Sequence, residues 1–168
     1  MRLVKRIFIA SILLLLLGSC ERDEICLEDI TPRLVVRFYN NNIPDEEKSV
    51  IGLKVHLEGI EGEYTDETLT QLTDSVMIPI RVDQDLTRII LTLSGDESAG
   101  IEDNPDTLEI DYSREDLFIS RSCGYKTIFH EGMLKQIDDG DNWIQMAKTV
   151  DEPQEIIDEK QAHVKVYH

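Results

Sequence analysis

The sequence predicts an all-β protein, an antiparallel β-sandwich of about seven or eight strands with an immunoglobulin-like arrangement. After residue 30, apolar and polar residues alternate repeatedly with period two, which places the apolar side chains on one face of a strand. The alternating runs are separated by clusters of Gly, Pro, Asn and Asp, and no sustained helical periodicity is present. Alternation does not distinguish two packed sheets from a closed one, so a small β-barrel is the alternative.

Eight segments carry this strand pattern. In chain order they are residues 33–39, 49–58, 75–80, 87–93, 107–112, 116–130, 143–150 and 162–168. The inward positions expected in the first five are Leu34, Val36 and Phe38; Ile51, Leu53, Val55 and Leu57; Val76, Ile78 and Ile80; Ile89, Leu91 and Leu93; and Leu108, Ile110 and Tyr112.

Turn-forming residues connect these segments. The turn clusters lie at residues 40–47, 58–64, 82–85, 94–106 and 138–142. The Cys, Trp, Cys order of antibody domains is absent, because Trp143 follows both Cys26 and Cys123, so the immunoglobulin likeness is architectural only.

The first 19 residues have the layout of a secretory signal peptide. Three basic residues precede an apolar run from Ile7 to Leu17, which is shorter than the about 20 residues that a spanning helix needs. Leu17-Gly18-Ser19-Cys20 resembles the lipobox of bacterial lipoproteins, which implies cleavage before Cys20 and a lipid on its sulfur. We therefore expect a signal peptide at 1–19, a lipidated tether at 20–30 and a β-sandwich domain at 31–168.

The net charge excludes one class of partner. Removing the leader leaves 14 Lys and Arg against 34 Asp and Glu, a formal charge of −20. Nucleic acid is an unfavourable ligand for such a chain, because binding to phosphates depends on Lys and Arg. Anionic lipids repel this charge too, so we expect membrane association through the covalent lipid.

The remaining two cysteines predict a disulfide. With Cys20 lipidated, Cys26 and Cys123 form an even pair in an exported protein, where thiols oxidise. Their bond would tie the segment that follows the lipid to the strand at residues 116–130. A nucleophilic role for Cys123 would need a neighbouring base, which the sequence does not indicate.

Several segments together resemble a known family. The lipobox, Cys26, TPRLVVRFYNNN from Thr31, REDLFISRSCGYKTIF from Arg114 and AHVKVYH from Ala162 are similar to those of uncharacterised Bacteroidetes lipoproteins that carry a domain of unknown function. The resemblance implies an exported lipoprotein, and it brings no activity, cofactor or ligand with it.

Catalytic and metal-binding patterns are weak. Ser120, His130 and Asp116 could be combined into a triad, but no G-x-S-x-G motif supports them, so we predict no catalytic residue. The turn at 138–142 offers oxygen ligands for calcium without the EF-hand register, and a solvated turn is the competing interpretation. The residues of this calcium candidate are Asp138, Asp139, Asp141 and Asn142.

We expect a non-enzymatic binding or structural accessory module that is lipid-anchored at the bacterial outer membrane and faces the periplasm or the cell surface. Its expected partners are the membrane, through the lipid, and an envelope protein or glycan. The alternatives are a hydrolase that uses acidic loop residues on envelope polymers or glycans, and a calcium-stabilised adhesin-like module. Strand alternation places Tyr125 and Phe129 on the same face, where both would point outward and form a recognition patch. The competing interpretation is that they fill the core, as aromatic residues in strands more often do.

Overall fold

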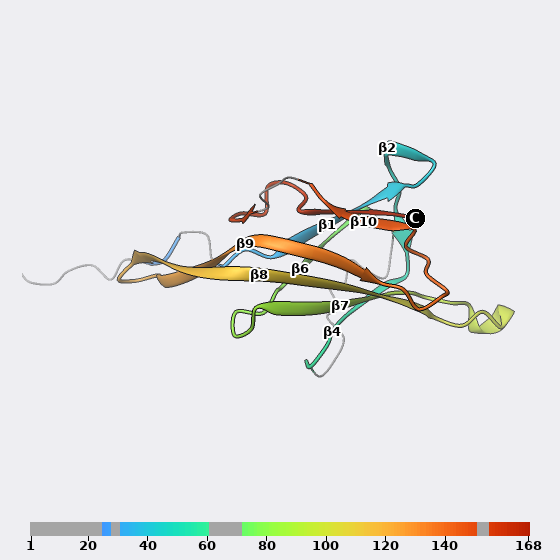
Figure 1. Ribbon diagram of the computed structural model, residues 1–168, viewed down its shortest axis with the longest axis horizontal. Coiled ribbons are helices and arrows are strands. Elements are labelled where there is room, and N and C mark those ends of the chain that lie inside the picture. The colour runs from blue at the N-terminus through green and yellow to red at the C-terminus, as the bar shows by residue number, and fades with distance from the viewer. Residues whose placement is uncertain (1–24, 28–30, 61–71, 151–154) are drawn as a thin grey trace, which may run out of the picture.

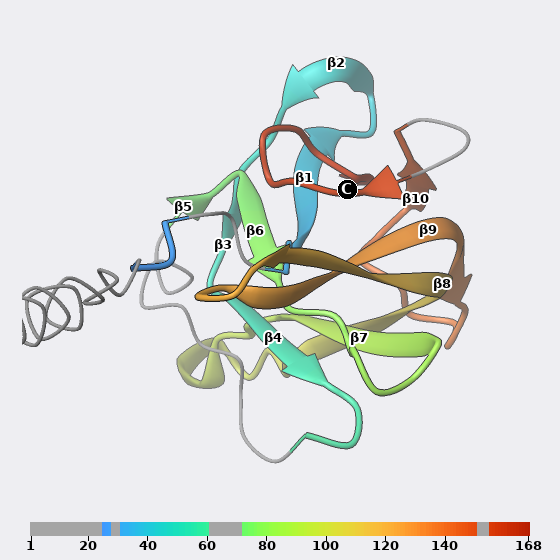
Figure 2. The same cartoon turned by 90° about the vertical axis from the view of Figure 1, so that its left-hand side faces the viewer.

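The computed structural model describes residues 25–27, 31–60, 72–150 and 155–168, and these form two five-stranded sheets and one two-stranded sheet (Figures 1 and 2). The expected signal peptide and Cys20 lie outside the described residues. Within the described ranges, no helix is long and apolar enough to cross a bilayer. The elements are β1 (Leu34–Asn40), β2 (Ile43–Glu47), β3 (Val50–Ile51), β4 (Leu53–Leu57), β5 (Leu72–Thr73), β6 (Ser75–Ile78), β7 (Leu86–Leu93), the 3₁₀ helix η2 (Glu97–Ala99), β8 (Asn104–Ser120), β9 (Gly124–Ile137), β10 (Met146–Thr149), β11 (Glu155–Ile156) and β12 (Val164–Tyr167).

The first sheet is built around β1, in the order β10-β12-β1-β2, and β6 also pairs with β1. The pairing of β1 with β12 is parallel, and it sets Val36 opposite Val164 and Phe38 opposite Val166. At the centre of this sheet the first strand of the chain, β1, pairs with the last strand, β12. The pairing therefore links the beginning and the end of the described sequence.

The second sheet is a fully antiparallel array in the order β11-β9-β8-β7-β4. Its longest ladder joins β8 and β9, from Thr107 opposite Ile137 to Ser120 opposite Gly124. One half of this hairpin lies within the sandwich. The other half projects beyond it, at the left of Figure 1.

One apolar cluster joins the two sheets and confirms the predicted β-sandwich. None of the sheets in the described residues closes into a barrel. The core contains most of the predicted inward side chains, and Leu34, Val36, Phe38, Ile89 and Leu108 are each at most 1% exposed. The structure has more strands than the seven or eight expected, because short ladders such as β3 with β5 and β11 with β9 contain only two residue pairs each.

Two expected strands are divided in two. Residues 116–130 were predicted to be one strand, but the turn at 121–123 separates the end of β8 from the start of β9, so Cys123 lies in a turn. Residues 49–58 were predicted to be continuous, but Gly52 has a φ of 67°, so the chain breaks there into β3 and β4. The break shifts the alternation by one residue, because a left-handed glycine interrupts the pleat. Val50 is buried in place of Ile51, which is 67% exposed. The prediction of an inward Ile51 was therefore wrong, whereas Leu53, Val55 and Leu57 are buried as expected.

A second difference concerns residues 40–47, which were predicted to be a turn. Only the first part of this segment turns, and residues 43–47 form β2 with every residue exposed. β2 pairs with the end of β1 at two positions, Tyr39 with Glu47 and Asn40 with Ile43. The sequence of β2 lacks the alternation of apolar and polar residues that predicts a strand, because neither of its faces packs against the core.

Tyr112 carries a buried hydrogen-bond network between β8 and the segment that precedes β7. Its hydroxyl donates to the carbonyl oxygen of Arg81 at 2.8 Å and lies 2.6 Å from the hydroxyl of Thr87. Thr87 in turn accepts a hydrogen bond from the backbone N–H of Arg81 at 3.0 Å. Burial raises the pKa of Tyr112. Its hydroxyl therefore stays protonated and can donate to the Arg81 carbonyl oxygen.

Replacing Tyr112 by phenylalanine is expected to lower the free energy of unfolding by about 1–3 kcal/mol, because the Arg81 carbonyl and the Thr87 hydroxyl lose a buried partner. Urea denaturation of the wild type and of Tyr112→Phe measures the difference. Tyr125→Phe is the control, since its side chain is exposed and the change should stay within about 0.5 kcal/mol. Equal effects of the two substitutions would contradict the network.

Candidate functional site

The projecting end of the β8–β9 hairpin holds the only disulfide of the described residues, which joins Cys26 to Cys123 with their Cα atoms 4.9 Å apart. The turn that carries Cys123 is closed by a hydrogen bond from its backbone N–H to the Ser120 hydroxyl at 3.1 Å. Gly124 then has a φ of 74°, a conformation that favours glycine. The hairpin tip is therefore a tight turn that is tied covalently to the segment at 25–27.

An exposed aromatic pair lies directly behind this turn. Phe118 on β8 faces Tyr125 on β9 in the strand register, and their rings meet edge to face with centroids 5.3 Å apart. Phe118 is 58% exposed and Tyr125 is 69% exposed. Large aromatic side chains in a strand normally fill a core, so an uncovered pair at a projecting tip indicates a contact surface.

The expectation of an outward Tyr125 and Phe129 is wrong for Phe129, which is 1% exposed and packs against Tyr112 with ring centroids 5.1 Å apart. Both residues lie on the same face of β9, because they are four positions apart with regular pairing between them. The face is covered at Phe129 and uncovered at Tyr125. The outward partner of Tyr125 is Phe118.

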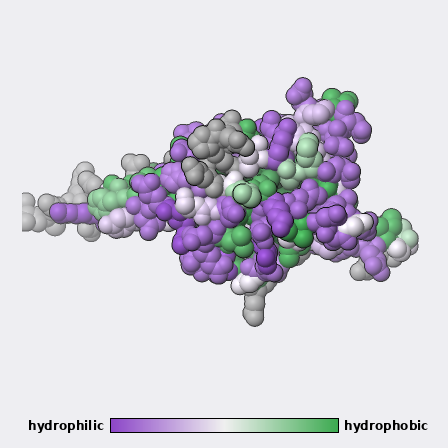
Figure 3. Space-filling model, viewed as in Figure 1, coloured by the Kyte–Doolittle hydropathy of each residue, from purple (hydrophilic) through white to green (hydrophobic). Residues whose placement is uncertain are grey.

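The segment that the disulfide holds adds two apolar side chains to the tip. Ile25 and Leu27, on either side of Cys26, are both strongly exposed. Figure 3 shows apolar surface at this narrow end of the molecule, whereas polar surface covers most of the visible body. We call these four residues, Ile25, Leu27, Phe118 and Tyr125, the tip cluster.

The tip also differs from the rest of the chain in charge. Residues 117–130 contain no Asp or Glu, although the chain has 34 of them, and they contain the basic residues Arg121 and Lys126. Arg121 is exposed at the turn and Lys126 is half-buried beside Tyr125. The hairpin tip is thus apolar and basic on a strongly acidic protein.

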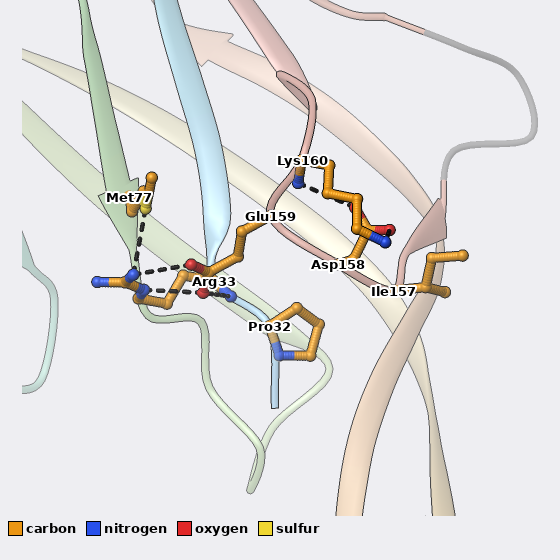
Figure 4. Close-up of a pocket in the computed structure, with 7 residues that line it drawn as sticks. All are labelled: Pro32, Arg33, Met77, Ile157, Asp158, Glu159 and Lys160. Atoms are coloured by element: carbon orange, nitrogen blue, oxygen red, sulfur yellow. Dashed lines mark hydrogen bonds and ion pairs between the residues drawn. The ribbon is translucent and has the colours of Figure 1, made fainter. Parts of the chain in front are cut away.

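A separate pocket of about 640 Å³ lies beside the start of β1 (Figure 4). Arg33 donates to both carboxylate oxygens of Glu159, at 2.8 and 2.7 Å, and to the sulfur of Met77 at 3.1 Å. This guanidinium holds the pKa of Glu159 below its usual range. The charges in this pocket compensate one another, because Lys160 likewise lies 3.3 Å from Asp158. The residues lining it are Pro32, Arg33, Met77, Ile157, Asp158, Glu159 and Lys160.

His163 is buried close to this pocket and holds the C-terminal segment against β1. Its Nδ1 accepts the backbone N–H of Val35 at 2.9 Å, and its own backbone N–H donates to the Val35 carbonyl at 2.8 Å. Burial lowers the pKa of His163, and this outweighs the hydrogen bond to the backbone of Asp158 and the charges of Asp158 and Glu159, which raise it. The ring is therefore neutral, with its proton on Nε2, and it has a structural role.

The structure does not bring together the residues of the hypothetical triad. The Asp116 carboxylate accepts the Thr127 hydroxyl at 2.7 Å, and the Ser120 hydroxyl lies 3.0 Å from that of Ser122. The ring of His130 contacts the carboxylates of two glutamates, on β8 and β11. Each of the three groups thus has a different partner, and none of them activates another.

In the acidic turn at 138–142, two carboxylates are used within the turn itself. Asp138 accepts the backbone N–H of Gly140 at 2.9 Å, and Asp139 accepts that of Asp141 at 3.0 Å. In the part of the chain that the structure describes, no group of three or more His, Cys, Asp or Glu side chains is arranged to hold a metal ion. A calcium site there stays a prediction, and its signature would be a Tm that rises with calcium and falls with chelator.

A buried carboxylate that the sequence did not single out organises this loop. Asp106, which is fully buried at the start of β8, accepts the backbone N–H groups of Ile144 at 2.7 Å and Trp143 at 3.4 Å. Burial raises its pKa, and the bonds from Ile144, Trp143 and the Asn142 side chain partly offset this effect. The amide of Asn142 also donates to the Ile137 carbonyl oxygen at 3.3 Å, so its N–H groups have partners within the loop.

The fold and the site define a class of protein, a disulfide-linked β-sandwich with a projecting hairpin whose tip is apolar and basic. The chain belongs to a family of unknown function (DUF6452), because the sequence model of that family matches residues 56–168. The matched part contains Cys123 and the whole β8–β9 hairpin, and Cys26 and β1 lie before it. Comparisons with curated proteins and with solved structures found no match.

Sequence reasoning found Cys26, Cys123 and Tyr125 but missed Phe118 as part of the tip. The absence of acidic residues from 117–130 was a visible signal for this surface. The pairing of Arg33 with Glu159 gave no signal, because 126 positions separate them and nothing local connects one to the other.

Replacing both Cys26 and Cys123 by alanine is expected to lower the free energy of unfolding by about 2–5 kcal/mol, since the bond closes a long loop in the unfolded chain. Guanidinium denaturation of the oxidised protein measures the effect. A reductant should lower the stability of the wild type to that of the double variant and leave the variant unchanged. An oxidised wild type no more stable than the variant would contradict the stabilising role of this bond.

The stability of the fold is expected to fall as the pH drops below about 6.5, because His163 in the unfolded chain takes up a proton more readily than in the folded one. In His163→Asn this decline should be shallower, as an asparagine oxygen near the Nδ1 position accepts the Val35 N–H without titrating. Thermal unfolding from pH 5 to 8 tests this. His56→Asn is the matched control and should keep the wild-type slope, and identical slopes in both variants would refute the assignment.

Proposed function

We propose that this protein is a lipid-anchored, non-enzymatic accessory module of the bacterial outer membrane that faces the periplasm or the cell surface. The observation that carries the proposal is the disulfide between Cys26 and Cys123, which fastens the segment behind the lipobox cysteine to one end of the fold. The resemblance of the lipobox, Cys26 and three further segments to those of Bacteroidetes lipoproteins supports it.

The distance between lipid and fold is short. Five residues lie between Cys20 and Cys26, and an extended chain spans at most about 3.6 Å for each step from one Cα to the next. The hairpin tip therefore lies within about 20 Å of the lipidated residue. In a protein anchored through Cys20, the disulfide would hold this end of the domain beside the bilayer.

The opposite end of the molecule would face a partner. β2 and η2 lie there, far from the hairpin tip in Figure 1. All five residues of β2 are exposed and three of them are acidic, so this end presents a polar strand edge. Such an edge suits an envelope protein or glycan that is bound through hydrogen bonds, because it offers backbone groups and carboxylates.

The two alternatives have less support from the described residues. A hydrolase would need accessible carboxylates that converge in a cleft, whereas Asp106, the acid whose pKa burial raises, is bonded to backbone N–H groups beneath a loop. A calcium-stabilised adhesin would need the acidic turn to collect its oxygen atoms around one point. Adhesion by a rigid, anchored scaffold therefore remains the favoured mechanism.

Metabolic labelling with an alkyne palmitate analogue in a bacterium that processes lipoproteins is expected to mark the wild type and place it in the membrane fraction. Cys20→Ala should lose both the label and the membrane retention, because the acceptor sulfur is gone. The Cys26→Ala, Cys123→Ala double variant is the matched control and should remain labelled. An unlabelled wild type, or membrane retention of Cys20→Ala equal to that of the wild type, would refute the anchor.

A further inference from the structure

We propose that the tip cluster of the β8–β9 hairpin inserts into the interfacial region of the bilayer to which the protein is anchored. This inference rests on the proposed anchoring through Cys20. It assigns a second contact, made by Ile25, Leu27, Phe118 and Tyr125, which fixes the orientation of the domain on the membrane.

The first argument is the uncovered apolar face. The side of β9 that buries Phe129 continues past the end of the sandwich to Tyr125, where nothing in the described residues covers it. Phe118 enlarges this surface from the neighbouring strand. An apolar surface of this kind marks a contact with a protein or a membrane, and aromatic residues are enriched where a membrane meets water.

The second argument is charge complementarity. Anionic headgroups repel a chain of this acidity, yet residues 117–130 carry no carboxylate side chain and do carry Arg121 and Lys126. Basic residues near a membrane surface are attracted to anionic lipids. The hairpin at 117–130 is thus the part of the domain that anionic headgroups attract, whereas the acidic β2 at the far end is repelled. This attraction acts against the five carboxylates and one arginine of residues 21–29.

The third argument is position. The disulfide brings Ile25 and Leu27 to the tip, only five and seven residues after Cys20. The acyl chains and the tip cluster therefore approach the same bilayer from one end of the molecule. A protein partner at the tip would have to fit between the domain and the membrane, within about 20 Å of chain, so the lipid interface is the occupant that the tether favours.

The experiment places a fluorescent reporter in the tip of the full-length lipoprotein. Tyr125→Trp is reconstituted into vesicles of phosphatidylethanolamine and phosphatidylglycerol with and without brominated phosphatidylcholine, which quenches tryptophan within the bilayer. Wild-type protein supplies the background, because its single tryptophan, Trp143, donates to the Leu91 carbonyl at 3.0 Å within the body. Ile43→Trp, on exposed β2, is the matched control at the far end.

We expect the emission of Tyr125→Trp to shift to shorter wavelength on vesicles and to fall as the bromolipid content rises. Wild type and Ile43→Trp should show neither change. Reversing the charges with Arg121→Glu and Lys126→Glu in the Tyr125→Trp background should reduce the quenching on anionic vesicles, since the headgroups would then repel the tip.

Co-sedimentation with the vesicles separates this proposal from the anchor. Protein that co-sediments while Tyr125→Trp stays unquenched would overturn tip insertion alone and leave the lipid anchor supported. Protein that neither carries an acyl group nor co-sediments would overturn the anchor and the tip contact together. Quenching of Ile43→Trp equal to that of Tyr125→Trp would also refute the proposed orientation.

Discussion

The β8–β9 ladder is the constraint on which the rest of the structure depends. Its inner half supplies Leu108, Ile110 and Phe129 to the core and pairs on its two sides with β7 and β11. Among the described residues no sheet lies opposite its outer half, so the same alternation that buries Phe129 exposes Tyr125. One continuous pair of strands thereby produces both the stability of the sandwich and its exposed tip. The disulfide at the turn joins that tip to the N-terminal segment.

The charge of the molecule differs between its body and the tip of the β8–β9 hairpin. The body carries most of the 34 acidic residues, which keep an all-β surface soluble and discourage contact between sheet edges. The tip, without carboxylates from 117 to 130, is the exception. A net charge describes the average of these regions and predicts repulsion from anionic lipid, whereas the distribution of charge in space predicts an orientation. The proposed membrane contact depends on this difference.

Buried polar side chains fix the conformations of the loops, which the alternation of apolar residues in the strands does not specify. Asp106 holds the loop before β10, Tyr112 holds the segment before β7, and His163 holds the chain before β12 against β1. In each case one side chain satisfies backbone groups from another part of the chain. Such groups are costly to bury without a partner, so each contact selects one loop conformation among many.

The sequence by itself determined the all-β class, the buried face of most strands and the cysteine pair, because period-two alternation and residue type are local properties. It also gives the acidic character of the chain, and it predicts the export signal on which the anchoring proposal depends. Only the tertiary structure decided that β1 and β12 pair in parallel, that Gly52 divides one strand, and that Phe118 with Tyr125 is uncovered while Phe129 is buried. Burial depends on what lies opposite a residue in space, and residues as distant in sequence as Arg33 and Glu159 meet only when the sheets pack.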